Sequence, residues 1–299
     1  MMIEWELYRS FLGVLREGSL SGAARVLGVA QPTVGRHIAT LEGALGLALF
    51  TRSQTGLLPT EAALVLRPHA QAMESTAAAL ERTAASYGDG VRGVVRVTAS
   101  EVIGLEVLPQ VVGRLRERYP ELKVELVLSN EVQDLLQREA DVAVRMTRPS
   151  QDQLVARRIG SVELGLHASG AYLARHGAPA SLDELSQHSL IGYDRPTPFV
   201  RAALKRWPQF ARERLALRTD SDAAQLALIR ADAGIGVCQA ALARRSPALV
   251  RLLPEAFSLE LETWVTMHED LRDSPRCRVT FDALVEALGD YTRNTEGLV

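Results

Sequence analysis

Residues Ser19–Leu47 read SLSGAARVLGVAQPTVGRHIATLEGALGL, and this stretch predicts two helices joined by a tight turn. Ser19 or Ser21 is suited to begin the first helix, because a serine hydroxyl accepts a hydrogen bond from a free backbone N–H. Gly28 lies where the turn needs a residue without Cβ, and Pro32 fits the first turn of the second helix. The inward face of the second helix is predicted from apolar residues at helical spacing, namely Val34, Ile38, Leu41 and Leu45.

The outward face of the second helix is polar or cationic, and no Asp or Glu occurs between Gly18 and Leu41. Such a face would fit against the phosphates and base edges of a DNA groove. From the spacing alone, an ordinary helical hairpin on a soluble domain is the alternative, since helix-turn-helix geometry is common. The outward positions are Gln31, Thr33, Arg36, His37 and Thr40.

The flanking chain carries a resemblance to a known family. Trp5, Leu7, Phe11, Val14, Glu17, Gly18 and Ser19 precede the hairpin, and Leu41-Glu42, Leu45-Gly46, Leu49-Phe50 and Arg52 follow it. With the hairpin, these residues closely resemble the N-terminal domain of the LysR-type transcriptional regulators. The resemblance covers residues 1–65 in register, and the remainder is similar to the family's effector domain in length and element order.

A few positions depart from the family pattern. Ala30 and Gly35 stand where the family usually has serine, and Ala63 stands where it often has glycine. Ala30 removes the usual cap of the second helix, and Gly35 removes a hydroxyl that could bind phosphate. The departures therefore concern individual DNA contacts and not the fold.

Residues 49–60 contain Gly56 and Pro59 between short apolar pairs, which predicts a two-stranded wing. Arg52 in this segment could enter the neighbouring minor groove, and a solvated loop arginine is the alternative. The resemblance implies a winged helix-turn-helix domain that binds double-stranded promoter DNA. The residues expected to contact DNA are Gln31, Pro32, Thr33, Arg36 and His37 in the groove and Arg52 in the wing.

The whole chain has 299 residues and a net charge of −2, so DNA binding must depend on where its charges lie. Cys238 and Cys277 lie far apart and lack C-x-x-C spacing, and we therefore expect neither a disulfide nor a metal site. The opening Met-Met-Ile-Glu-Trp-Glu lacks the features of a signal peptide, and no apolar run is long enough for a membrane helix. These features lead us to expect a cytoplasmic protein with no membrane contact.

Residues 61–86 are rich in Ala, Leu and Glu and predict one long helix that could bend at Pro68. A helix of this length with an Ala-rich stripe favours pairing with the same helix of a second subunit. The alternative is a lone helix packed on its own domain. The resemblance implies a dimerising linker helix, in a dimer or in a tetramer built as a dimer of dimers.

The segment Tyr87-Gly88-Asp89-Gly90 breaks the helix and predicts a domain boundary. Strands and helices alternate beyond it, which is typical of a parallel sheet with crossover helices. We expect strands at 94–98, 122–128, 141–144, 162–167, 190–193, 215–218, 235–238 and 259–268, and helices at 105–118, 132–138, 171–175, 222–231 and 278–291.

The predicted fold class is therefore α+β overall, with a winged helix-turn-helix, a long linker helix and a two-lobed α/β effector domain. Two lobes joined by crossings near 160–163 and 266–268 form the architecture of periplasmic binding proteins, which the LysR-type effector domain shares. The expected domains are 1–60 for DNA binding, 61–88 for the linker and 89–299 for the effector. Within the effector domain, the first lobe comprises about 91–161 and 267–299, and the second about 162–266.

A ligand of such a domain is expected beyond the carboxyl ends of the strands, at helix N-termini. Hydroxyl and N–H groups there would hold a small carboxylate or another anion. The residues expected to bind the effector are Thr98, Ser100, Asn130, Arg145, Thr147, Asp194, Thr219 and Val237. Arg145 could instead pair with Asp141, and Asp194 would repel an anion and suit a ligand with a donor group.

The resemblance implies that the residues matching Ser100, Asn130, Thr147 and Thr219 line the inducer cleft. For each of them, a helix cap or a turn residue is the alternative interpretation.

The sequence contains no G-x-S-x-G elbow, P-loop or H-E-x-x-H motif, so we expect no enzymatic activity and no cofactor. The prediction is a DNA-binding transcriptional regulator of the LysR type that responds to a small molecule, with RNA polymerase as a further candidate partner. The alternative is a solute-binding or sensor protein whose N-terminal helices serve only to dimerise. A small-molecule enzyme that uses the interlobe cleft is a distant third interpretation.

Overall fold

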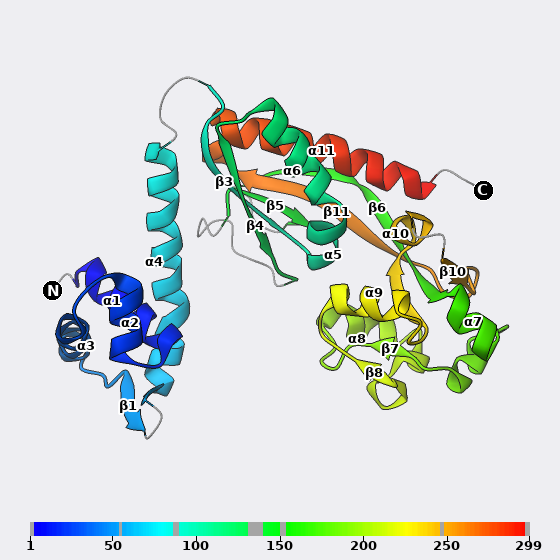
Figure 1. Ribbon diagram of the computed structural model, residues 1–299, viewed down its shortest axis with the longest axis horizontal. Helices are drawn as coiled ribbons and strands as arrows, with labels where there is room; N and C mark the ends of the chain where they lie inside the picture. Colours follow the sequence, from blue (N-terminus) through cyan, green and yellow to red (C-terminus); the bar gives the residue numbers. More distant parts are fainter. Residues whose placement is uncertain are drawn as a thin grey trace. The chain divides into compact units, whose positions relative to one another are not determined.

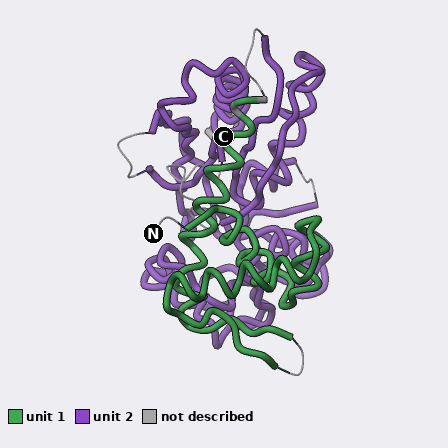
Figure 2. Tube along the Cα trace, turned by 90° about the vertical axis from the view of Figure 1, so that its left-hand side faces the viewer, with its two compact units in different colours: residues 1–84, 136–139 green, residues 85–135, 140–299 purple. Residues whose placement is uncertain are grey.

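A computed structural model of the chain describes residues 3–53, 56–85, 90–130, 140–149, 154–245 and 248–296. The described chain separates into two compact units that divide near residue 85, and Figure 2 colours them separately. After the roles predicted from the sequence, we call residues 3–84 the DNA-reading unit and the described residues from 85 onward the effector unit, and describe each by itself. No helix in the described ranges is both long and apolar enough to cross a membrane.

The DNA-reading unit begins with three helices, α1 (Trp5–Glu17), α2 (Leu20–Leu27) and α3 (Gln31–Leu45), in the part of the chain that the structure describes. Ser19, not Ser21, caps α2, and its side chain accepts from the Gly22 N–H at 3.1 Å. Gly28 has φ +68° and ends α2, which confirms the predicted turn. The predicted inward face is also confirmed, since Val34, Ile38 and Leu41 are buried and Leu45 is partly buried.

The wing consists of β1 (Phe50–Ser53) and β2 (Gly56–Pro59), which pair antiparallel as predicted. Two contacts fix it to the helices. The Glu42 carboxylate accepts from the Leu49 N–H at 2.7 Å, and the Leu57 N–H donates to the Gly18 carbonyl at 2.8 Å. The wing therefore has a defined position beside α3.

The linker forms one continuous helix, α4 (Glu61–Ala85), with Pro68 inside it. The Thr60 side chain accepts from the Ala63 N–H at 3.2 Å at the start of this helix. Ala63 and Ala70 are buried in the core of the DNA-reading unit. Large apolar side chains of α4 are exposed, namely Leu64, Val65, Met73 and Leu80.

The effector unit is built on a sheet in the order β10-β6-β11-β5-β3-β4, with β9 pairing to β6. The strands are β3 (Gly93–Ala99), β4 (Leu122–Leu128), β5 (Val142–Arg145), β6 (Leu154–Ser169), β9 (Gly236–Gln239), β10 (Leu249–Leu252) and β11 (Leu259–His268). Strand β3 runs parallel to β4 and β5, as the alternation predicted. The helix α11 (Pro275–Glu296) packs against β6 and against α6 (Leu108–Arg118).

Strands β6 and β11 pair antiparallel from Leu154↔His268 to Leu164↔Leu259, with an irregularity between Thr263 and Trp264. Figure 1 shows these two strands running together through the effector unit. The strand expected at 162–167 is therefore too short, because the segment thought to be an interlobe crossing is itself paired strand. A single sheet extends into both lobes.

The helix predicted at 105–118 is two helices, α5 (Glu101–Glu106) and α6 (Leu108–Arg118). Pro109 lies at the start of α6, where it has no N–H to continue the hydrogen bonding of α5. The helix predicted at 132–138 lies outside the described residues. The first lobe, as we use the term below, comprises β3–β5, α5, α6 and α11.

The second lobe contains short elements beside β6. They are α7 (Gly170–His176), η2 (Asp183–Gln187), β7 (Ile191–Gly192), α8 (Pro198–Leu204), η3 (Pro208–Phe210), η4 (Arg212–Arg214), β8 (Leu217–Arg218), α9 (Asp222–Arg230), β9, α10 (Ala240–Arg245) and β10. A short η5 (Glu269–Leu271) follows β11. The strands predicted at 190–193 and 215–218 shorten to two residues each, and α8, α10 and β10 were not predicted.

Gly56→Ala tests the attachment of the wing. Gly56 has φ +133°, and a Cβ there would lie 2.5 Å from the Gly18 carbonyl oxygen. We expect the DNA-reading unit to lose about 1–3 kcal/mol of unfolding free energy, measured by urea denaturation. The matched control is Gly43→Ala, at an exposed position of α3, where nothing lies within 4 Å of the new Cβ. The unfolding free energy of this variant should rise by about 0.5–1 kcal/mol. Equal effects of the two substitutions would contradict this account.

Candidate DNA-reading surface and effector cavity

The start of α3 presents the side chains predicted to contact DNA. Gln31, Pro32 and Arg36 are exposed, and Thr33 is half-buried. Ala30 occupies the N-cap position without a side-chain hydrogen bond, because its methyl group cannot accept one. The first turn of α3 therefore combines exposed polar side chains with backbone N–H groups that have no side-chain cap, an arrangement that suits a phosphate.

His37 is half-buried, and a hydrogen bond connects its ring to α1. Its Nδ1 lies 2.7 Å from the hydroxyl of Ser10, a residue of α1 that is only 2% exposed. This hydrogen bond fixes the orientation of the imidazole ring. When Ser10 is the donor, the ring proton is on Nε2, which then acts as a donor.

Arg52 lies on the first strand of the wing, opposite Leu57, and is exposed. Because Glu42 and Gly18 hold the wing, the arginine extends from a fixed ribbon. Its contact with DNA stays a prediction, as do those of the α3 residues.

The effector unit contains a cavity of about 500 Å³ between its lobes. Five of the eight predicted effector residues line it, namely Ser100, Asn130, Arg145, Thr147 and Val237. The first lobe contributes mainly polar groups at the ends of β3, β4 and β5. The second lobe contributes a largely apolar wall, which includes Phe199, Val200, Ala203, Leu204, Trp207 and Phe257.

The other three predicted residues are not among those that line the cavity, and each forms a hydrogen bond or an ion pair with another residue of the effector unit. Thr98 accepts from the Arg145 guanidinium at 2.8 Å. Asp194 forms an ion pair with Arg212, whose side chain lines the cavity, at 2.7 Å. Thr219 accepts from the Ser221 N–H at 3.2 Å, and its contact with an effector stays a prediction.

Two groups on the first-lobe side remain suited to a ligand. The Ser100 hydroxyl is buried and, within the described ranges, has no hydrogen-bond partner. Arg145 donates to Thr98 and to the Val144 carbonyl, whereas Asp141 accepts from the Arg96 N–H at 2.9 Å. Burial lowers the pKa of the Arg145 guanidinium, because a low-dielectric surrounding disfavours its charge.

The first turns of α5 and α9 meet at the lobe interface, and Glu101 connects them. Its carboxylate accepts from the Ser221 hydroxyl at 2.7 Å and from the Ala223 N–H at 3.4 Å. The chain's own carboxylate therefore occupies the start of α9, where an anionic effector was expected. Sequence reasoning missed Glu101 because an acid in the first turn is an ordinary feature of any helix.

Asp222, the first residue of α9, forms the second interlobe contact. Its carboxylate accepts from the Asn130 side chain of the first lobe at 2.9 Å and, within the second lobe, from the Tyr193 hydroxyl. Burial raises the pKa of Asp222, and the charge of Glu101 adds to this effect. Burial likewise raises the pKa of the Tyr193 hydroxyl, which stays protonated as a donor.

A third interlobe contact joins α5 to α9 as an ion pair. Arg230 donates to both carboxylate oxygens of Glu106, at 2.6 and 3.0 Å. This hydrogen bonding lowers the pKa of Glu106. Together, the contacts of Glu101, Asn130 and Glu106 join the first lobe to the second lobe at α9.

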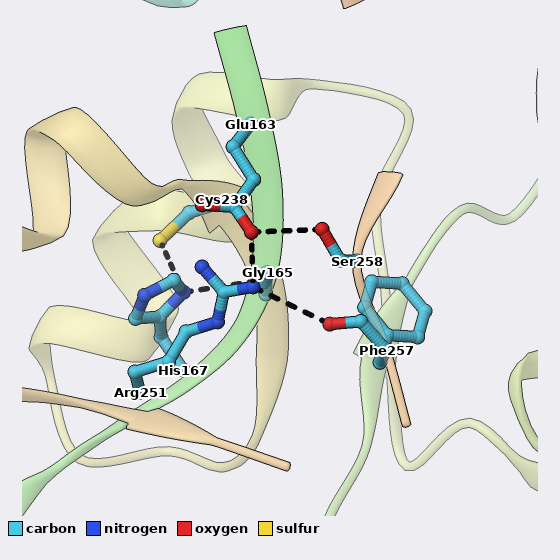
Figure 3. A network of polar contacts seen from close by, with 7 residues as sticks. All are labelled: Glu163, Gly165, His167, Cys238, Arg251, Phe257 and Ser258. Carbon is cyan, nitrogen blue, oxygen red and sulfur yellow. Dashed lines mark hydrogen bonds and ion pairs between the residues drawn. The ribbon is translucent and has the colours of Figure 1, made fainter. Parts of the chain in front are cut away.

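A polar network lies on β6 beside the cavity (Figure 3). Cys238 lines the cavity, and its Sγ is 3.3 Å from Nδ1 of the buried His167. Burial lowers the pKa of His167 to about 4 and raises that of Cys238 to about 12, so both are neutral near pH 7. Arg251 lies across Gly165 and pairs with Glu163 at 2.7 Å. His167 is thus a core residue inside the second lobe.

Two models of known protein families match the chain. A model of the LysR substrate binding domain matches residues 88–289, and a model of the bacterial regulatory helix-turn-helix protein, lysR family, matches residues 5–64. The chain belongs to the LysR family. These two matches confirm the resemblance inferred from the hairpin and its flanks, and with them the predicted fold class.

Individual LysR-type relatives are more distant. An HTH-type transcriptional regulator of Xanthomonas campestris is 34% identical over 60% of this chain and 53% of its own length. The transcriptional regulator CrgA of Neisseria meningitidis is 32% identical over 62% of each chain. These two matches thus span between half and two thirds of the lengths of the two relatives.

Solved structures match over nearly the full length. The CrgA structure from Neisseria meningitidis has a TM-score of 0.59 and 28% identity, and covers 95% of this chain and 98% of that chain. The LysR-type regulator CbnR has a TM-score of 0.67 at 20% identity and covers 97% and 99%. The latter likeness concerns the fold alone.

Asp222→Asn tests the protonation state of the lobe interface. Because the pKa of Asp222 is raised above its usual value of about 4, the native protein holds this proton to higher pH than the unfolded chain. Ionisation of Asp222 should therefore lower the unfolding free energy as the pH rises from the usual pKa of an aspartate through the raised pKa of Asp222. We expect the variant to gain stability relative to wild type with rising pH, in urea denaturation of the effector unit.

Glu106→Gln is the control of opposite sign. The lowered pKa of Glu106 means that its stabilisation is present above the ordinary pKa of a glutamate and is lost as the pH falls through the lowered value. This variant should be less stable than wild type near neutral pH, and the difference should vanish on acidification. Parallel stability curves for both variants and wild type would show that neither acid is perturbed.

Proposed function

We propose that this LysR-type protein is a sequence-specific transcriptional regulator that binds promoter DNA under the control of a small molecule. The observation that carries the proposal is the exposed start of α3, with Gln31, Pro32 and Arg36 beside a wing fixed by Glu42. Such a helix enters the major groove with its N-terminal residues at the base edges. The relatives named above are themselves described as transcriptional regulators.

DNA recognition of this kind requires two copies of the DNA-reading unit. The apolar side chains exposed on α4, including Leu64 and Leu80, support pairing of this helix with its counterpart in a second subunit. Two paired units would read half-sites about 34 Å apart or a multiple of that distance. We propose a dimer that associates further into a tetramer, with RNA polymerase as an additional partner on the promoter.

The effector would bind in the interlobe cavity and act through the closure of the lobes. Ser100, Asn130, Arg145, Thr147 and Val237 line this cavity, and α5 and α9 meet beside it. A ligand shifts such an equilibrium only when it binds one arrangement of the lobes more tightly than another. We propose that a change in closure alters the association of subunits and thereby the bending of the DNA.

We further propose that the protein acts in the cytoplasm and works as a regulator without catalysis. We base the proposed location in the cytoplasm on the proposed partner, promoter DNA. The neutral state of Cys238 and His167 near pH 7 supports a binding cavity over a nucleophilic site, because a reactive cysteine needs a lowered pKa.

Arg36→Ala tests the DNA-reading role of α3. If Arg36 contacts a base edge, the variant should bind duplexes selected by the wild-type protein from a random-sequence library more weakly by about 1–3 kcal/mol. Affinity should be measured by gel shift over a series of salt concentrations, because phosphate contacts determine the salt slope. The charge-matched control is Arg118→Ala on α6, which should leave both quantities unchanged.

Unchanged affinity and salt slope in Arg36→Ala would remove this residue from the DNA contacts. If wild-type protein selected no duplex at all, the sensor interpretation without DNA binding would replace the regulator.

A further inference from the structure

The second-lobe wall of the cavity includes a short helix that has no buried residue. None of the residues of α8 (Pro198–Leu204) is buried, although Phe199, Val200, Ala203 and Leu204 line the cavity. Phe199 is 42% exposed. The same wall includes Trp207 and Phe257, which pack with ring centroids 4.5 Å apart. An apolar face of this kind gains stability when an apolar body covers it.

The opposite side of the same cavity carries one positive charge. Arg145 makes two hydrogen bonds, to a hydroxyl and to a carbonyl, and in the described part of the chain it forms no ion pair. A largely buried cation without a counter-ion is unfavourable, and an anionic group of a ligand would compensate it. The Ser100 hydroxyl lies on this side as a further donor without a partner among the described residues.

A second anionic group has no comparable place. The start of α9, the other position suited to an anion, already holds the Glu101 carboxylate. Asp220 and Asp222 also line the cavity and would repel a second negative charge.

We propose that the effector cavity is selective for an acid with one anionic group and a bulky apolar body, preferably aromatic. The acid would pair with Arg145, and the body would lie against α8 and Trp207. The volume of about 500 Å³ is in the range of pockets that enclose such ligands. This inference deepens the proposed function, because it names the class of effector for the proposed site.

The test uses the full-length protein and isothermal titration calorimetry with defined probes. Naphthoate and phenylbutyrate represent the proposed class in two shapes. Naphthylmethanol keeps the aromatic body without the charge, naphthalene dicarboxylate adds a second charge, and succinate lacks the body. We expect at least one of the two acids to bind at least tenfold more tightly than each of the three comparison compounds.

Two substitutions locate the binding. Arg145→Met should weaken binding of the acid at least tenfold and leave naphthylmethanol unchanged. Ala203→Trp should fill the space beside α8 and abolish binding of the acid, whereas the matched control Ala202→Trp, at an exposed position of the same helix, should not. Thermal denaturation of each variant shows that it is folded.

The proposal is overturned if neither acid binds, if the dicarboxylate or succinate binds as tightly as the acids, or if Ala202→Trp and Ala203→Trp behave alike. A gel shift on the same preparations separates this failure from that of the proposed function. DNA binding that persists while both acids fail to bind would reject the effector class and leave the regulator intact.

Discussion

The pairing of β6 with β11 is the constraint on which the effector unit depends. Both strands pass from one lobe to the other, and every other strand of the sheet attaches to this ribbon directly or through a neighbour. A change in lobe closure must therefore be absorbed along the ribbon itself. The irregularity between Thr263 and Trp264 interrupts its ladder, and such interruptions are where a strand bends and twists.

Besides this ribbon, side-chain contacts near α5 and α9 connect the two lobes, and they differ in character. Glu106 and Arg230 form a partly exposed ion pair, whereas Asp222 is a buried acid held by the donors Asn130 and Tyr193. Glu101 lies between them at the start of α9, in the position of an anionic ligand. Opening the lobes would break the contacts that Glu106, Asn130 and Glu101 make with the second lobe, so a ligand that favours an open arrangement has to offset them.

The DNA-reading unit has to present a surface suited to a polyanion although the chain as a whole has a net charge of −2. The absence of acids between Gly18 and Leu41 keeps the face of α3 free of negative charge, and the acid that follows, Glu42, accepts backbone N–H groups of the wing. Position rather than total charge thus prepares this surface for a polyanion.

Local patterns in the sequence determined the helices of the DNA-reading unit, their caps and the two-stranded wing. Ser19, Gly28 and Pro32 act on neighbours a few residues away, and the long helix from Glu61 and the strand from Leu259 to His268 follow from periodicity. The carboxyl ends of β3, β4 and β5 also placed four of the eight expected effector residues at one cavity, and β9 contributes a fifth, Val237.

The tertiary structure decided which of these groups already have partners. Glu101 meets Ser221, and Asn130 meets Asp222, across about a hundred residues of chain, and no spacing rule encodes such contacts. The pairing of Asp194 with Arg212, 18 residues further along the chain, was likewise not visible from the sequence, whereas the contact of Thr219 with Ser221 is local and a turn residue was among the interpretations. Short elements such as α8 escape periodicity, because one or two turns carry too little pattern, and their place in the cavity wall is set by packing.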